Sequence, residues 1–268
     1  MRNPLAFYEQ YILGVRDAEE VEEEVAANTL GTVIHNVLEN FYKPFEGKIL
    51  VVQDVKAMLK NTSDAVEKEF QKEYSSAQII SGLNYITVQA AIEYVTKFLK
   101  TELDLLQSGN EIQVVAIESN LKIAIPTKKI DFPVLIKGKV DRVDRLNGQL
   151  RIVDYKTGYV NPAHLKIKNW EGLTDDDKHS KALQILMYAY MYCQEKNVTT
   201  PVQGGIISFK KLNDGFLPFG VHVSGRNYDL EITPDVFDAF LLQLETLITE
   251  ICNINTAFIQ KDEPTRFT

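Results

Sequence analysis

Residues 138–158, "GKVDRVDRLNGQLRIVDYKTG", contain two runs with the alternating pattern of β-strands, joined by Asn147-Gly148. An Asn-Gly pair is typical of a two-residue hairpin turn, because both central positions require a positive φ. If the turn forms there, Leu146 pairs with Gln149, and this pair sets the register of the whole hairpin. The stretch therefore predicts two antiparallel strands with a defined register.

That register sets like charges against each other. Asp141 lies opposite Asp154 and Lys139 lies opposite Lys156, at Cβ separations of about 4.5–5.5 Å, where like charges destabilise a sheet. A divalent cation removes the conflict, because carboxylates from neighbouring strands can hold Mg²⁺ or Mn²⁺. Lys156 shares a face with Asp154 and is placed to orient or deprotonate a water. The alternatives are an ordinary surface ion pair, or a one-residue slip that separates the aspartates.

Helical and strand patterns occupy different parts of the chain. Apolar residues recur at helical spacing before residue 110, and the period changes to two after Gly109. The predicted helices span 28–45, 52–74, 84–107, 180–196 and 234–252, and the predicted strands span 112–126, 132–146, 149–157 and 202–212. We therefore expect an α/β fold with a helical annex over residues 1–110 and a core over 111–268, together forming one structural unit.

The charge is distributed unevenly along the chain, whose net charge is −8. Residues 1–110 hold 10 Lys and Arg against 17 Asp and Glu, and much of the acid lies in residues 17–25. Residues 112–211 hold 16 Lys and Arg against 10 Asp and Glu, a net charge of +6. This segment can steer a polyanion toward the hairpin, although solvated faces are the alternative interpretation of both segments.

Several classes of protein are not indicated by the sequence. No apolar run approaches the ~20 residues that span a bilayer, and the start lacks a signal-peptide pattern, so we expect a cytoplasmic protein with no membrane partner. The two cysteines, Cys193 and Cys252, are far apart and have no Cys or His nearby at metal-ligand spacing. They predict buried apolar positions rather than a disulfide, a zinc site or an iron–sulfur cluster within this chain.

Four motifs, in order, resemble those of a known nuclease family. "GTVIH", "GKVDRVD", "VDYKTG" and "QILMY" are similar to the motifs of the RecB-like branch of the PD-(D/E)XK nucleases, which includes nuclease domains of helicase-nuclease complexes such as the AddB type. The resemblance covers residues 28–192. It implies a restriction-endonuclease-like mixed sheet flanked by helices, with residues 111–268 as the nuclease core and the His motif in the annex. It also implies a Mg²⁺- or Mn²⁺-dependent deoxyribonuclease, more narrowly the exonuclease domain of a DNA-repair helicase-nuclease.

The resemblance further implies a metal site and a catalytic group. His35, Asp141, Asp154 and the carbonyl oxygen of Tyr155 would bind the metal. Asp141, Asp154 and Lys156 would be the catalytic residues. His35 alone, beside apolar helix positions, is also typical of a buried core histidine, so its assignment depends on the other motifs.

Three further residues match the family pattern less specifically. Gln184 and Tyr188, four residues apart and so on one helix face, would contact the DNA backbone or the active-site lysine, although each is also an ordinary helix residue. Glu118 precedes the first aspartate on a predicted strand and resembles an optional acidic residue of the superfamily.

The sequence also differs from iron–sulfur members of the family. Asn3 stands where those members begin with a cysteine, and their three later cysteines are not present before Thr268, so we expect no four-cysteine cluster here. The start within this motif predicts a piece of a longer chain, with DNA and a helicase, or another subunit or domain, as partners. A noncatalytic DNA-binding or scaffolding module is the alternative function, and a nuclease of RNA or branched DNA is a third.

Overall fold

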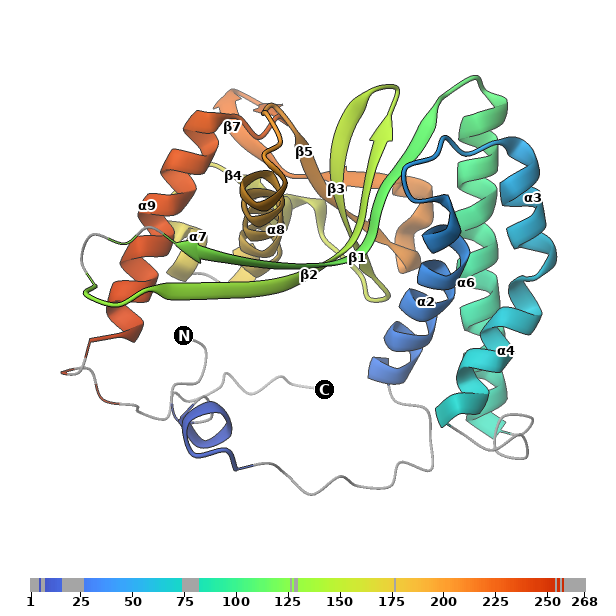
Figure 1. Ribbon diagram of the computed structural model, residues 1–268, viewed down its shortest axis with the longest axis horizontal. Helices are drawn as coiled ribbons and strands as arrows, with labels where there is room; N and C mark the ends of the chain where they lie inside the picture. The colour runs from blue at the N-terminus through green and yellow to red at the C-terminus, as the bar shows by residue number, and fades with distance from the viewer. Residues whose placement is uncertain are drawn as a thin grey trace.

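The centre of the fold is a five-stranded mixed sheet with the strand order β1-β2-β3-β5-β6 (Figure 1). The computed structural model describes residues 5, 8–15, 27–73, 82–125, 127, 130–175, 177–253, 255 and 257. The strands of this sheet are β1 (Ile112–Ile125), β2 (Val134–Leu146), β3 (Gln149–Lys156), β5 (Gln203–Ser208) and β6 (Phe216–Pro218). Only β3 and β5 are parallel among these neighbours, so the expected mixed α/β architecture is confirmed.

The β2–β3 hairpin has the register that its turn predicts. Leu146 pairs with Gln149, and the ladder continues to the pair Arg142–Val153. The Asn and Gly of the turn have φ values of 51° and 85°, the positive values that this type of hairpin requires. A local turn preference is therefore sufficient to align the two strands.

The ladder stops one pair before the two aspartates of the predicted site. The carboxylate of Asp141 accepts the backbone N–H of Tyr155 at 2.7 Å, so a side chain of β2 replaces the β2 backbone as the partner of β3. The predicted direct pairs, Asp141 with Asp154 and Lys139 with Lys156, are consequently not part of the ladder. The strands are adjacent and antiparallel as predicted, but the opposition of like charges is wrong in detail.

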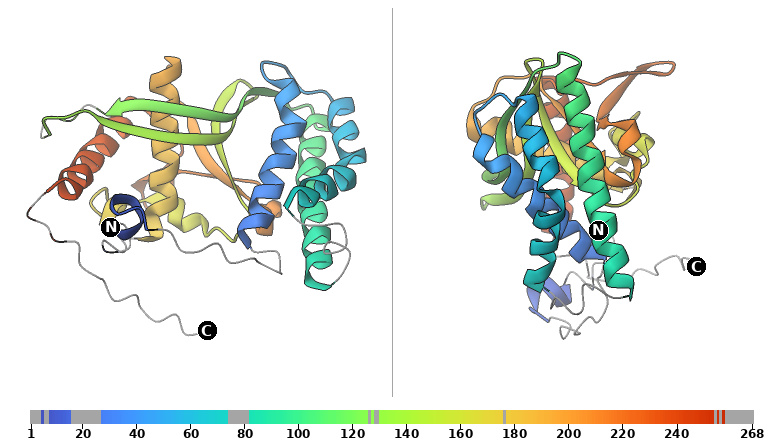
Figure 2. Two further views of the ribbon diagram at one scale, coloured as in Figure 1. Left: turned by 60° about the horizontal axis from the view of Figure 1, so that its bottom comes forward. Right: turned by 90° about the vertical axis from the view of Figure 1, so that its right-hand side faces the viewer.

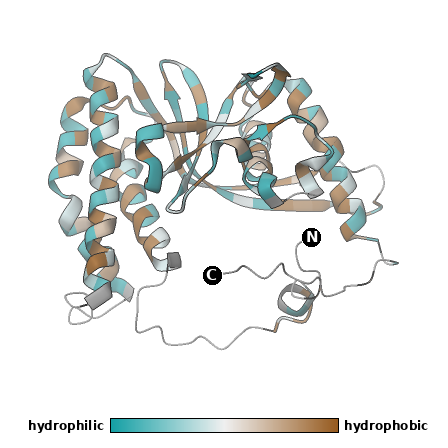
Figure 3. Ribbon diagram, turned by 180° about the vertical axis from the view of Figure 1, so that it is seen from behind, coloured by the Kyte–Doolittle hydropathy of each residue, from teal (hydrophilic) through white to brown (hydrophobic). Residues whose placement is uncertain are grey.

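Helices cover both faces of the sheet (Figures 1 and 2). One face packs against α8 (Ser180–Lys196), α9 (Pro234–Ile251) and the short α7 (Gly172–Asp175). The other packs against the annex helices α2 (Ala27–Tyr42) and α6 (Gly82–Gln107), with α3 (Val52–Lys60) and α4 (Thr62–Glu73) beside them. Annex helices and strands both carry brown and teal segments in Figure 3, as expected for elements with one buried side.

The predicted helix over 52–74 is helical but not continuous, because it is broken into α3 and α4 at Asn61. The Asn61 side chain donates a hydrogen bond to the carbonyl of Ala57, and the Thr62 hydroxyl donates one to the carbonyl of Met58. Such side chains compete for the carbonyls of the preceding turn and favour a helix end. The break allows both short helices to pack against α6.

The predicted strand over 202–212 is also too long. It ends at Ser208 and continues as the 3₁₀ segment η5 (Phe209–Asp214). Phe209 and Leu212 both enter the core on the annex side, and a separation of three residues places two side chains on one side of a helix but not of a strand. The spacing of these two residues is therefore the signal that favours a helical turn over a longer strand.

The remaining described segments are short. A three-stranded sheet contains β4 (Lys166–Ile167), β7 (Gly220–Ser224) and β8 (Asn227–Asp229). The π-helical η1 spans Tyr8–Ile12, and the 3₁₀ segments are η2 (Lys43–Phe45), η3 (Pro162–Leu165) and η4 (Asp177–His179). No described helix has both the length and the apolar composition to cross a membrane.

Two features that entered the sequence argument, Asn3 and the acidic run 17–25, lie outside the described residues. The two cysteines differ from each other in burial. Cys193 is buried on α8 as predicted, whereas Cys252, just beyond α9, is only half-buried. Apolar packing thus explains Cys193 better than Cys252.

Candidate metal centre

Three ligand-type side chains converge where α2, β1 and β2 meet. His35 on α2, Glu118 on β1 and Asp141 on β2 each offer an atom within 4.8 Å of the others, and we call them the metal-ligand cluster. His35 Nδ1 lies 3.4 Å from Asp141 Oδ1 and 3.6 Å from Glu118 Oε1. Both carboxylates are buried. An imidazole and two carboxylates from three elements therefore surround one point.

The backbone of Tyr155 holds this cluster against β3. Its N–H donates to Asp141 Oδ2 at 2.7 Å, and its carbonyl oxygen lies 3.2 Å from His35 Nε2. The Tyr155 ring is buried between the sheet and the annex, where it packs edge-on against Phe98. Packing of the ring thus fixes the backbone groups that contact His35 and Asp141, including the carbonyl that the family resemblance assigns to the metal.

Asp154 and Lys156 lie beside the cluster on β3. Lys156 Nζ contacts the two carboxylate oxygens of Asp154 at 2.9 and 2.8 Å. Burial raises the pKa of Asp154 to about 6; Lys156 opposes this rise, and the charge of Asp141 adds to it. Asp154 is therefore close enough to Asp141 for their charges to interact, although it is not one of the three residues within 4.8 Å.

Glu118 enters the site through an unusual backbone conformation. Its φ is 50°, a left-handed value that costs roughly 1–2 kcal/mol for a residue with a Cβ. The pairs on either side, Ile117–Arg142 and Ser119–Val140, keep the same register. The conformation therefore redirects the carboxylate without shifting the ladder, as is common where a site imposes strain.

Lys139 is the site residue whose role the sequence does not reveal. Its Nζ lies 2.5 Å from Glu118 Oε2, and this hydrogen bond raises the pKa of Lys139. In the sequence it stands only as an unexplained charge opposite Lys156. The signal that could have revealed this role is the position of Lys139 two residues before Asp141, because alternate side chains of a strand lie on the same side.

The electrostatics and donor types suit a divalent cation. Burial disfavours a charged imidazole, but hydrogen bonds and charge from Asp141 and Glu118 outweigh it and raise the pKa of His35 from 6.5 to about 10. The cluster is thus negative enough to attract positive charge strongly. Carboxylate and carbonyl oxygens are ligands that Mg²⁺ and Mn²⁺ prefer, so these residues fit such an ion.

Gln184 and Tyr188 approach the same region from α8. Gln184 Nε2 donates to Tyr188 Oη at 2.9 Å. Burial raises the pKa of Tyr188, and the charges of Asp154 and Asp141 add to the rise. The two side chains therefore bind each other within electrostatic range of the aspartates, and their contact with DNA stays a prediction.

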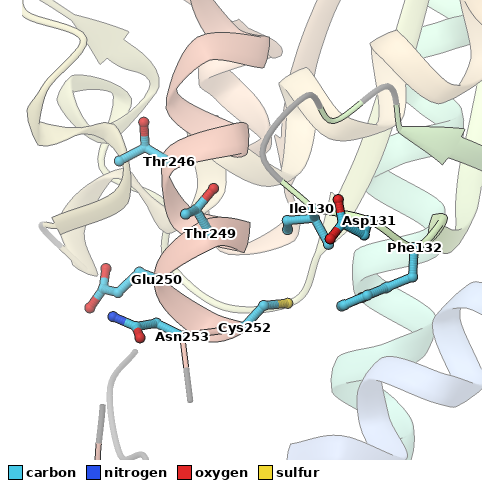
Figure 4. A pocket seen from close by; sticks show the side chains of 8 residues that line it. All are labelled: Ile130, Asp131, Phe132, Thr246, Thr249, Glu250, Cys252 and Asn253. Carbon is cyan, nitrogen blue, oxygen red and sulfur yellow. The ribbon is translucent and has the colours of Figure 1, made fainter. Parts of the chain in front are cut away.

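A separate hollow lies at the C-terminal end of α9 (Figure 4). Its lining comes from the segment before β2 and from the end of α9: Ile130, Asp131, Phe132, Thr246, Thr249, Glu250, Cys252 and Asn253. None of the site residues predicted from the sequence lines it. The sequence predictions therefore give no reason to place the candidate site in this hollow.

Comparison with known proteins gives a matching family model and distant relatives. The family model of the PD-(D/E)XK nuclease superfamily matches residues 1–262. One subunit of an ATP-dependent helicase/deoxyribonuclease from Streptococcus pneumoniae is 26% identical over 162 residues, which cover 58% of this chain and 14% of that protein. The protein of the same name from Alkaliphilus oremlandii is 23% identical over 218 residues, covering 75% of this chain and 18% of its own length. The chain thus spans less than a fifth of these relatives.

Proposed function

Because the chain belongs to the PD-(D/E)XK nuclease superfamily, we propose that it hydrolyses DNA phosphodiester bonds with the help of Mg²⁺ or Mn²⁺. The observation that carries the proposal is the convergence of His35, Glu118 and Asp141 beside the ion pair of Asp154 and Lys156. Helix α2 and the three consecutive strands β1, β2 and β3 supply these groups, which is more than a chance cluster on one helix would provide.

We assign metal binding to His35, Asp141, Asp154 and the Tyr155 carbonyl, with Glu118 as an additional ligand. A bound Mg²⁺ or Mn²⁺ would supply Lewis-acid polarisation of the phosphate and activation of water. The Tyr155 N–H keeps one oxygen of Asp141 occupied, so the carboxylate has a fixed orientation.

Lys156 is the group we assign to the reacting phosphate. Its side chain is 30% exposed, whereas that of Asp154 is 2% exposed, so the ammonium group can reach solvent while the carboxylate cannot. At that position the ammonium orients the attacking water and compensates the negative charge that develops on the phosphate. Gln184 and Tyr188 would hold the DNA backbone nearby.

The test combines DNA cleavage with metal titration. Wild type should cleave DNA with Mg²⁺ or Mn²⁺ and not with EDTA. Asp154→Asn should abolish cleavage and lower Mn²⁺ affinity in calorimetry, because a charged ligand is lost. Lys156→Ala should abolish cleavage while Mn²⁺ binds at least as well, because both carboxylates stay and one positive charge is removed. Lys60→Ala, which changes an exposed residue of α3, is the matched control.

Several outcomes would contradict the catalytic assignment. Wild type that cleaves no single-stranded, double-stranded or branched DNA, or a Lys156→Ala variant that cleaves normally, would replace it with the noncatalytic DNA-binding or scaffolding function. Cleavage of RNA but not of DNA would change the proposed substrate class and leave the proposed metal chemistry unaltered.

We further propose that the chain acts as the exonuclease part of a cytoplasmic DNA-repair helicase-nuclease. The support is the names of its relatives, which include an "exonuclease/helicase subunit RexB" from Streptococcus pneumoniae, 26% identical over 162 residues. Cleavage of DNA with blocked ends, compared with cleavage of the same DNA with free ends, tests the exonuclease assignment. Equal cleavage of both substrates would contradict it.

A further inference from the structure

A groove along β1 and β2 lies next to the metal-ligand cluster. It is lined by Asn120, Leu121, Lys122, Lys137, Gly138, Lys139 and Glu195. Lys139 also contacts Glu118 of the cluster at 2.5 Å. Gly138 lies against Tyr188, since a Cβ added there would be 3.1 Å from Tyr188 Cε1. The groove therefore reaches the site at Lys139, and Tyr188 packs against Gly138 from the α8 side.

Two lysines oppose each other in this groove without a compensating acid. Lys122 and Lys137 form a direct cross-strand pair, and both are exposed. The carboxylate of Glu195 accepts the backbone N–H of Lys122 at 2.8 Å and pairs with Lys196 at 2.9 Å. Within the described part of the chain, the ammonium groups of Lys122 and Lys137 have no hydrogen bond or ion pair. This arrangement costs stability, because like charges directly opposed repel.

The charges in the groove are ordered along the strands. Lys139 and Lys137 alternate on β2, so their side chains share a face and lie about 7 Å apart along the strand. Their cross-strand partners are Asn120 and Lys122. Three positive positions, those of Lys139, Lys137 and Lys122, therefore lie side by side and begin next to Glu118. A ligand with repeated negative charges matches this group better than a single small anion.

We propose that this groove binds the sugar–phosphate backbone of one DNA strand next to the phosphate that is cleaved, with Lys122 and Lys137 contacting successive phosphates. The inference rests on the proposed nuclease function and adds a substrate path to it. Phosphates would remove the repulsion between Lys122 and Lys137. Because Gly138 has no Cβ, Tyr188 can pack closely against the sheet beneath the path.

The test uses the double variant Lys122→Ala/Lys137→Ala and a single-stranded oligonucleotide. Binding is measured in Ca²⁺ over a series of KCl concentrations, and cleavage is measured in Mg²⁺. The dissociation constant should rise roughly 10-fold, and the slope of log K against log[salt] should become shallower by about 1.4, because two phosphate contacts are lost. KM should rise to a similar extent, while kcat and Mn²⁺ affinity stay within about twofold of wild type.

Lys56→Ala/Lys60→Ala removes two exposed lysines from α3 and is the matched control, which should bind as wild type does. An unchanged salt slope in Lys122→Ala/Lys137→Ala would overturn the path and leave the nuclease function standing. Reduced Mn²⁺ affinity in that variant would also overturn it, since the lysines would then act on the cluster. If wild type does not cleave but the variant still loses DNA affinity, the nuclease proposal fails and the path stands.

Discussion

Strand β2 carries two buried aspartates, Asp141 and Asp144, which belong to ion clusters of different construction. Asp141 belongs to the metal-ligand cluster. Asp144 belongs to what we call the arginine cluster, which contains Glu102, Arg142, Asp144 and Arg151. The arginine cluster pairs two acids with two guanidinium groups at 2.8 Å, and Arg142 is 1% exposed. Its charges are balanced by groups that cannot leave.

Part of the negative charge of the metal-ligand cluster and of the neighbouring Asp154 is balanced by groups that can leave. Glu118 is paired with Lys139, whose side chain is 49% exposed, and the neighbouring Asp154 is paired with Lys156, which is 30% exposed. An exposed ammonium on a flexible stem can withdraw into water at little cost, whereas a buried guanidinium cannot. A candidate metal site therefore differs from a structural ion network in its exchangeable cations. Buried aspartates alone do not distinguish the two.

The sharpest test of this comparison exchanges each aspartate for asparagine. Asp144→Asn should destabilise the protein by about 3–5 kcal/mol, because Arg142 and Arg151 would lose a buried charged partner. Asp141→Asn should change the free energy of unfolding far less, since the amide oxygen can still accept the Tyr155 N–H and one crowded carboxylate is removed. Urea unfolding with a circular dichroism readout measures both, and equal losses would break the distinction.

The same Asp141→Asn protein should lose DNA cleavage and Mn²⁺ affinity while it stays folded. Activity retained in this variant would show that the cluster does not hold the metal. Activity cannot be used in that way for Asp144→Asn, because its expected loss of stability would itself reduce the fraction of folded enzyme.

Replacing the cations gives the next largest effect. Arg151→Lys should cost about 1–2 kcal/mol, because a lysine cannot reproduce the two hydrogen bonds to Asp144 at 2.8 and 2.9 Å. Lys139→Ala should change stability by less than about 1 kcal/mol, as is usual for a half-exposed ion pair, and should raise Mn²⁺ affinity because Glu118 becomes free. Calorimetric titration with Mn²⁺ and urea unfolding of both variants check these two expectations. Weaker Mn²⁺ binding in Lys139→Ala would contradict the idea of an exchangeable cation.

Much of the fold and part of the site follow from local sequence signals. The Asn-Gly turn sets the register of β2 and β3, and Thr233 and Pro234 mark the start of α9, where the Thr233 hydroxyl accepts the N–H of Val236. Proximity of Asp141 to Asp154 then follows from the hairpin. These features depend on residues close together in the chain, which is why the sequence predicts them.

The rest depends on tertiary contacts that no local pattern contains. The arginine cluster needs Glu102 from α6, far before Arg142 in the chain, and Glu102 also accepts a hydrogen bond from Tyr42 on α2. Nothing in the spacing of "DRVD" distinguishes an aspartate that faces these partners from one that faces His35. The entry of Glu118 into the site likewise depends on a φ of 50°, which residue type alone does not predict.

The smallest expected effect separates the backbone of Glu118 from its charge. Glu118→Gln removes the charge at the left-handed position and keeps the Cβ, whereas Glu118→Gly removes both the charge and the steric cost. Glycine also gains entropy in the unfolded chain, so we expect Glu118→Gly to be more stable than Glu118→Gln by only roughly 0.5–1 kcal/mol. Both should bind Mn²⁺ more weakly by a similar factor, because each lacks the carboxylate. Urea unfolding and calorimetry on the two variants check this. If Glu118→Gln is the more stable protein, the backbone conformation at residue 118 carries no strain that the site imposes.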